Sequence, residues 1–105
     1  MNDRISKIIN IGDTVKYLGN FRFDVNGAKF ELDKWGDCCA GIENEEVLLR
    51  NLAVNQPMIV TNVDDAGECV SIIGEYAQID IEGEYTSGSG YGGYLVYFEL
   101  SKVQV

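Results

Sequence analysis

The stretch that decides the fold is residues 21–32, which read FRFDVNGAKFEL. Apolar and polar side chains alternate on both sides of Asn26-Gly27, and this is the period of a strand with one buried face. Asn-Gly adopts the positive φ angles of a two-residue type I′ turn at low cost, so the stretch predicts a β-hairpin. The buried face of this hairpin is expected to carry Phe21, Phe23, Val25, Phe30 and Leu32.

Further alternating segments predict that much of the remaining chain is also strand. Turn-forming Gly, Asn and Asp residues separate these segments. In the last of them Val96, Phe98 and Leu100 are expected to face inward. The predicted strands cover residues 13–18, 58–63, 69–73, 76–82 and 94–100.

One longer segment, residues 43–54, has a helical spacing of apolar side chains. Val47, Leu48 and Leu52 share one face of a helix, and Leu49 lies near that face. Acidic residues come near the start of the segment, where the helix macrodipole favours negative charge. The spacing therefore predicts a short helix between the strands.

The other segments are shorter or irregular. Isoleucines at i, i+3 and i+4 in residues 3–10 suit one or two helical turns, with Asp3 as the N-cap and Gly12 as the stop. Residues 33–41 break the strand alternation and are predicted to form a loop. A glycine-rich connection is predicted over residues 83–93.

Three segments resemble the strands of SH3-like barrels. Residues 12–19, GDTVKYLG, resemble the first strand of that class, and residues 94–103 resemble its last strand and terminal turn. Residues 58–72 look like its central hairpin. Small proteins of this shape are frequent in bacteriophage genomes, so the resemblance implies a phage-type protein. It implies no catalytic residue, and residues 20–56 are an insertion relative to the pattern.

These observations lead to one expected architecture. A chain of 105 residues is the length of one domain, expected here over residues 1–105. We expect a mainly β protein with a minor α component, either a small SH3-like barrel or a bent-sheet barrel. It would carry an inserted β-hairpin and one short helix.

The composition excludes several classes of function. With 8 basic and 17 acidic residues the net charge is −9, which is unsuited to direct binding of nucleic acid through a basic surface. The chain has no histidine, so it holds no Ser-His-Asp triad, no Cys-His pair and no ordinary zinc-hydrolase site. We therefore expect a binding protein rather than an enzyme, without catalytic residues or a cofactor.

Hydropathy and cysteine usage predict the compartment. The apolar runs are far shorter than the about 20 residues that span a bilayer, and no signal-peptide core follows the first residues. A cytoplasmic location, without a membrane partner, is the expectation. Cys38, Cys39 and Cys69 are expected to be buried or half-buried reduced thiols, and a three-thiolate metal site is the less favoured alternative.

The acidic charge is unevenly distributed along the chain. Residues 1–50 hold seven bases and nine acids, whereas residues 51–105 hold one base and eight acids. Asp80, Glu82 and Glu84 recur at every second position and would share one face of a strand. The alternatives are a solvated face, a mimic of nucleic-acid phosphates that binds a basic surface, and a calcium site.

Aromatic residues provide two further candidate contacts. Residues 83–93 combine glycines with Tyr85 and Tyr91, a mixture typical of binding loops and also of a flexible hairpin tip. Backbone amides there would suit a small anionic nucleotide. Trp35 is either a lid on the core or an interface anchor.

The sequence therefore predicts an acidic, non-catalytic, phage-type inhibitor. It would bind a basic, nucleic-acid-handling surface of a bacterial defence protein, as a DNA mimic of the anti-CRISPR kind, in the host cytoplasm. The partner-binding residues are expected to be Glu75, Asp80, Glu82, Glu84, Tyr85, Tyr91 and Trp35. The alternatives are a protein that sequesters a nucleotide signal and a structural component of a virion or baseplate. A homodimer is compatible with each of these three functions.

Overall fold

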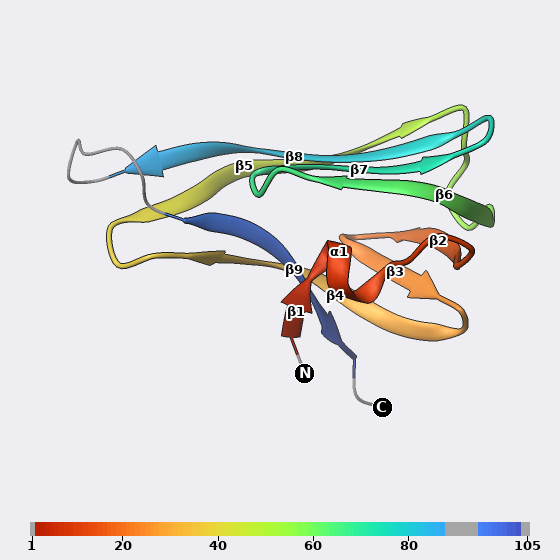
Figure 1. The fold of residues 1–105 in the computed structure, drawn as a ribbon, viewed down its shortest axis with the longest axis horizontal. Coiled ribbons are helices and arrows are strands. Elements are labelled where there is room, and N and C mark those ends of the chain that lie inside the picture. Colours follow the sequence, from red (N-terminus) through yellow and green to blue (C-terminus); the bar gives the residue numbers. More distant parts are fainter. Residues whose placement is uncertain (1, 88–94, 104–105) are drawn as a thin grey trace.

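Strands make up most of the fold. The structure is a computed structural model and describes residues 2–87 and 95–103 (Figure 1). It confirms the prediction of a mainly β protein with one short helix. The elements are β1 (Asn2–Arg4), α1 (Ile5–Ile8), β2 (Thr14–Gly19), β3 (Arg22–Val25), β4 (Ala28–Gly36), β5 (Ala40–Arg50), β6 (Met58–Asp65), β7 (Cys69–Gly74), β8 (Gln78–Ser87) and β9 (Val96–Lys102).

The nine strands of the described residues belong to one antiparallel sheet that bends back over itself. The strand order is β1-β9-β4-β3-β2-β6-β7-β8-β5. In Figure 1, β5 to β8 form one layer, and β2, β3, β4 and β9 lie across from it. Strand β6 joins the layers, because Met58 and Ile59 pair with β2 whereas Val60 and later residues pair with β7. The result is the bent, barrel-like sheet that was expected.

The core lies between the two layers. Alternate residues of β7, β8 and β9 point into it, as the strand period requires. Val96, Phe98 and Leu100 are all buried, as predicted. The helix α1 contributes Ile5, which is fully buried, and Ile9 follows it into the core.

The predicted hairpin is confirmed, but one of the five side chains expected in its buried face is exposed. Strands β3 and β4 pair across Asn26 and Gly27, whose φ angles are 52° and 90°. Phe23 and Val25 are buried, and Phe30 and Leu32 pack against the core. Phe21, however, is 40% exposed.

The exposure of Phe21 has a local cause. Gly19 pairs with Arg22, so Asn20 and Phe21 form the turn between β2 and β3. Both residues have positive φ angles, of 51° and 59°. The side chain of Phe21 therefore leaves the alternation of the strand and turns toward solvent.

The predicted helix at residues 43–54 is wrong, because this segment contains most of β5. Strand β5 pairs with β8 from Ala40 to Arg50. Val47 and Leu49 pack against the core at strand spacing, whereas Leu48 lies on the opposite face. The spacing of these apolar residues fits a strand as well as a helix. The segment forms a strand as far as Arg50 because β5 pairs with β8 over its whole length. The loop predicted at residues 33–41 is likewise mostly strand, since β4 continues to Gly36.

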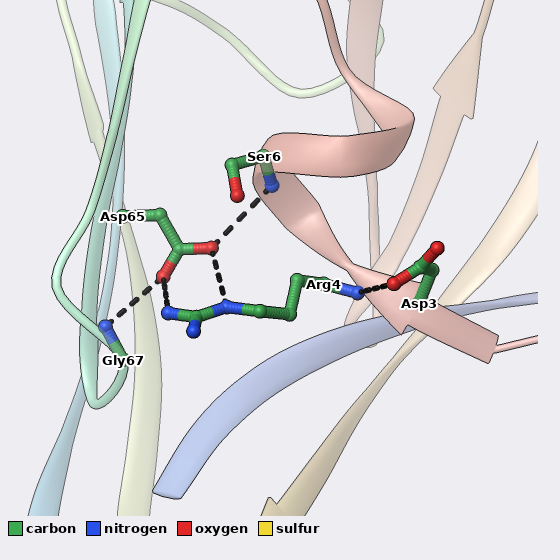
Figure 2. A network of polar contacts seen from close by, with 5 residues as sticks. All are labelled: Asp3, Arg4, Ser6, Asp65 and Gly67. Atoms are coloured by element: carbon green, nitrogen blue, oxygen red, sulfur yellow. Dashed lines mark hydrogen bonds and ion pairs between the residues drawn. The ribbon is translucent and has the colours of Figure 1, made fainter. Parts of the chain in front are cut away.

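The N-terminal helix is present but is not capped by Asp3. Its N-cap position is Arg4, which makes no side-chain cap, and Asp3 Oδ1 accepts from the Arg4 backbone N–H. Asp65, at the end of β6, supplies the acceptor instead (Figure 2). One of its carboxylate oxygens lies 3.4 Å from the backbone nitrogen of Ser6. A residue 59 positions away in the sequence thus accepts a hydrogen bond from a backbone N–H group in the first turn of α1.

The buried carboxylate of Asp65 connects the two layers of the sheet through its hydrogen bonds. Arg4 Nη2 donates to Oδ1 at 3.0 Å, and the Gly67 backbone N–H donates to the same oxygen at 3.0 Å (Figure 2). The Asp65 side chain is only 4% exposed. Burial alone would raise the pKa of Asp65, but the hydrogen bonds from Arg4, Gly67 and Ser6 hold it below its usual value. We refer to Asp65 with these three partners as the Asp65 junction.

Gly67 is expected to be irreplaceable at the tip of the β6–β7 turn. Its φ is 94°, and an added Cβ would lie 2.5 Å from the carbonyl oxygen of Val96. Gly67→Ala should lower the free energy of unfolding by about 2 kcal/mol or more, measured by urea denaturation. Gly12→Ala is the matched control, because its φ is 96° and nothing lies within 4 Å of its added Cβ. Equal losses for the two variants would contradict this close approach.

Candidate functional site

The outer face of the β6–β7–β8–β5 layer gathers the acidic side chains. Directly paired residues of antiparallel strands lie on the same face of a sheet. Glu82 pairs with Glu46, and Glu84 pairs with Glu43. Ser71 pairs with Asp80 on one side and with Asp64 on the other. We call the surface formed by the following residues the acidic outer face: Glu43, Glu46, Asp64, Asp80, Glu82 and Glu84.

Two pairs of glutamates face each other directly in this surface, although like charges at such positions destabilise a sheet. Among residues 2–87 and 95–103, no lysine or arginine forms an ion pair with any of these four glutamates. Glu46, Glu82 and Glu84 line a shallow hollow of about 220 Å³ together with Asn44 and Gly83. The hollow is therefore lined by three carboxylates that form no ion pair within the part of the chain that the structure describes.

A β-bulge shapes this hollow. Between Glu43 and Glu46 strand β5 has one more residue than β8, and Asn44 takes a φ of 54°. The amide Nδ2 of Asn44 donates to Glu84 Oε2 at 3.0 Å. Bulges re-aim side chains relative to the regular ladder. Here the bulge holds Glu84 by a neutral amide, so its negative charge is retained.

Asp80 differs from its neighbours because the chain already binds its carboxylate. Asp80 is 4% exposed and accepts hydrogen bonds from Arg50 Nε at 2.5 Å, Gln78 Nε2 at 2.7 Å and Ser71 Oγ at 2.8 Å. Burial would raise the pKa of Asp80, but these donors outweigh it and keep the pKa lowered. Asp80 thus anchors the centre of the acidic outer face, while Glu82 and Glu84 project beyond it.

Cys69 is an exposed thiol within the acidic outer face, so the prediction of a buried or half-buried thiol is wrong here, as it is for Cys38. It begins β7 and pairs directly with Glu82. Partial burial raises the pKa of Cys69, and the negative charges of Glu82, Asp80, Glu68 and Asp64 raise it further. The raised pKa of Cys69 is therefore partly a consequence of the negative electrostatic potential of this surface.

Tyr85 and Glu75 are predicted site residues that are not part of the acidic outer face. Tyr85 pairs with Ile42, which is a core residue, so the Tyr85 side chain lies on the opposite face from Glu84. Glu75 is exposed in the β7–β8 turn, where it lines a hollow with Tyr76. Tyr91 lies outside the described residues. The predicted connection at residues 83–93 is wrong in its first part, because β8 continues to Ser87.

Trp35 belongs to the other layer of the sheet. It pairs with Tyr97, and the two rings stack with centroids 5.0 Å apart and an interplanar angle of 16°. The Arg4 guanidinium lies 4.8 Å from the centre of the Tyr97 ring. Trp35 is 39% exposed, which is intermediate between the two predictions of a core lid and a free anchor.

Glu99 is a buried acid that the sequence pattern did not single out. It is 9% exposed and pairs with Asp33 on β4 and with Arg4 on β1. Arg4, which would be the natural partner, donates to Asp65 instead. Burial raises the pKa of Glu99, and the charges of Asp33 and Asp3 raise it further.

Comparisons with known proteins give this chain no relatives. Searches of protein-family models, curated proteins and solved structures each found no match. Within residues 2–87 and 95–103, no helix is long and apolar enough to cross a membrane. The same residues contain no cluster of three Cys, Asp or Glu side chains arranged to hold a metal ion. The fold and the site together define a small, mainly β protein with one acidic sheet face.

The stability of the fold should fall in acid because the carboxylates of Asp24, Asp65 and Asp80 are ion-paired. The pKa values of Asp24, Asp65 and Asp80 are lowered from an ordinary value of 3.8. Each therefore stabilises the fold above about pH 4 and loses that contribution as the pH falls through its lowered pKa. Urea denaturation from about pH 7 to about pH 2.5 should show a decreasing midpoint below about pH 4. A midpoint that stays constant over this range would contradict these ion pairs.

Proposed function

We propose that this chain is a non-catalytic binding protein whose acidic outer face docks on a basic, nucleic-acid-handling surface of another protein. The observation that supports the proposal is the presence of two pairs of directly opposed glutamates, Glu46 with Glu82 and Glu43 with Glu84. Such pairs cost stability within the chain. A partner that brings lysine or arginine side chains to them removes this cost and gains directed charge pairing.

The spacing of the carboxylates supports a mimic of nucleic-acid phosphates. Glu82 and Glu84 lie two residues apart on β8, so their side chains are about 6.8 Å apart along the strand. Glu46 and Glu43 repeat this row on the neighbouring strand, about 4.8 Å away. The spacing of the charges in these two rows is comparable with that of successive phosphates. The rows would therefore bind in a basic groove that accommodates a polyanion.

The finer expectations about the partner also remain proposals. A bacterial defence protein as target, and a phage-type inhibitor of the anti-CRISPR kind as the role, rest on the sequence resemblance and the charge. Both would use the same acidic outer face. The nucleotide-binding alternative depends on residues 83–93, of which residues 83–87 are strand and 88–93 lie outside the described residues. We therefore favour the acidic outer face as the site.

The proposal is tested by capture from a bacterial lysate followed by elution with DNA. The chain is immobilised, the lysate is applied at low salt, and bound protein is eluted with a short double-stranded DNA. The test variant is E43Q/E46Q/E82Q/E84Q, which neutralises the four carboxylates of the two opposed pairs. The control variant is E31Q/D33N, which neutralises two carboxylates of β4 in the other layer. We expect a protein that DNA elutes, that the control variant retains and that the quadruple variant loses.

Two results would contradict the proposed function. One is capture that the quadruple variant retains unchanged, which would place binding elsewhere on the chain. The other is a captured protein that high salt and DNA both fail to release, because a phosphate mimic must compete with phosphates and be screened by salt.

A further inference from the structure

The turn between β4 and β5 carries two thiols in contact. Cys38 and Cys39 are both free cysteines, and their Sγ atoms lie 2.8 Å apart. Cys38 is exposed and Cys39 is partly exposed, so small reagents in solution reach the pair. The third cysteine, Cys69, belongs to β7 and to the acidic outer face. The thiol pair is therefore a separate feature from the site proposed above.

The backbone holds the two cysteines at the centre of a tight turn. The Ala40 N–H donates to the carbonyl oxygen of Asp37 at 3.3 Å, which closes a four-residue turn with Cys38 and Cys39 in the middle. Asp37 Oδ1 accepts from the Cys38 N–H at 3.0 Å, and the Asp37 N–H donates to the carbonyl oxygen of Leu95 at 3.1 Å. The turn is thus hydrogen-bonded internally and to the start of β9.

Gly36 shows how closely the two sides of this turn approach. An added Cβ at Gly36 would collide with the backbone carbonyl of Ala40. The strand ends that flank the cysteine pair are therefore packed against each other. Two thiols that are already in contact on a held backbone need little further ordering to react with each other.

We propose that Cys38 and Cys39 form a redox-active vicinal dithiol that low-molecular-weight disulfides oxidise to an intramolecular disulfide at the tip of the β4–β5 turn. This inference goes beyond the proposed function and does not depend on it. It identifies a modification site and the chemical class of its reagent, a small disulfide of the glutathione type.

The reaction balances as two thiol–disulfide exchanges. One cysteine thiolate attacks a sulfur of the small disulfide, which breaks that S–S bond, forms a mixed disulfide and releases one small thiolate. The neighbouring cysteine thiolate then attacks the protein sulfur of the mixed disulfide and displaces the second small thiolate. The protein loses two electrons and two protons, and the small disulfide is reduced to two thiols. Because the product is exposed, an added dithiol is expected to reverse it.

The test uses the full chain with Cys69→Ser, so that the pair supplies all the thiols. The protein is incubated with excess oxidised glutathione and examined by intact mass spectrometry without reductant. We expect a mass lower by about 2 Da, no retained glutathione and no free thiol, with complete reversal by dithiothreitol. Circular dichroism before and after oxidation checks that the chain stays folded.

Single-cysteine variants distinguish the vicinal disulfide from ordinary thiol chemistry. C38S/C69S and C39S/C69S lack the resolving thiol, so each is expected to retain one glutathione and to show no 2 Da loss. Stable glutathione adducts on the paired form would overturn the proposal, and so would disulfide-linked dimers or thiols that stay free. Trp35, the one tryptophan of the chain, lies three residues from Cys38, and its fluorescence is expected to change in the paired form alone.

Discussion

Neutralising the opposed glutamates, as in E43Q/E46Q/E82Q/E84Q, is expected to stabilise the fold while it removes binding to a basic partner. The variant should gain about 0.5–2 kcal/mol in the free energy of unfolding, because two like-charged cross-strand pairs disappear. Glutamine at position 84 still accepts the hydrogen bond from Asn44. Stability and binding would therefore change in opposite directions, which is the behaviour expected of residues kept for function.

Urea denaturation of the two proteins at low and high salt measures this effect. At about 1 M salt the Debye length is about 3 Å, so the difference between the variant and the parent chain should shrink. The E31Q/D33N control changes acidic residues of β4 and leaves the two opposed pairs intact. A quadruple variant that is less stable than the parent at low salt would mean that these glutamates support the fold and are not in conflict with it.

Replacing Asp65, whose side chain is buried, is expected to cause a large loss of stability. Asp65→Ala leaves the Arg4 guanidinium and the backbone N–H groups of Gly67 and Ser6 without their acceptor. Removing one partner from such a buried arrangement should cost about 2–4 kcal/mol. The loss should be accompanied by faster hydrogen exchange in β1 and α1, because the Asp65 junction ties them to the other layer.

The comparison variant Arg4→Met removes the ion pair of the Asp65 junction together with the contact between the guanidinium and the Tyr97 ring. Methionine keeps an apolar stem of similar length but removes the guanidinium, and Asp65 retains its hydrogen bond from Gly67. Arg4→Met should therefore cost less than Asp65→Ala, as measured by urea denaturation of both variants. Equal costs would mean that the backbone donors contribute nothing to this junction.

The local parts of the fold were predictable because their signals are short-range. The Asn26-Gly27 turn and the alternation on both sides of it specify the β3–β4 hairpin without help from the rest of the chain. The strand ending in Leu100 was predicted for the same reason. Phe21 was misplaced because Gly19 and Asn20 mark the turn by composition, whereas nothing in the sequence shows that the turn also includes Phe21, whose φ is 59°.

The segment over β5 was not predictable from its own sequence. Its apolar residues, Val47, Leu48 and Leu49, are consecutive and fit a helix as well as a strand. The pairing with β8 decides the outcome, and that contact joins residues about 30 to 45 positions apart. A short-range pattern carries no information about such a partner strand.

The same limit explains how the candidate site was only half identified. The alternation of Asp80, Glu82 and Glu84 correctly placed an acidic row on one face of a strand. The second row, from Glu43 and Glu46, was hidden by the predicted helix, as was the proximity of Arg50 to Asp80. Arg50 supplies the positive charge that residues 51–101 lack, and it neutralises the most buried carboxylate of the row.

The most direct test of the acidic outer face as a docking surface is the reactivity of Cys69 in the complex. In a C38S/C39S background Cys69 is the remaining thiol, and it lies beside Glu82 on that face. Its alkylation by iodoacetamide is timed for the chain alone and for the chain bound to the protein that DNA elutes. We predict that the bound partner slows alkylation by about tenfold or more, since the thiol would be covered. Alkylation at the same rate in the complex as in the free chain would contradict the account.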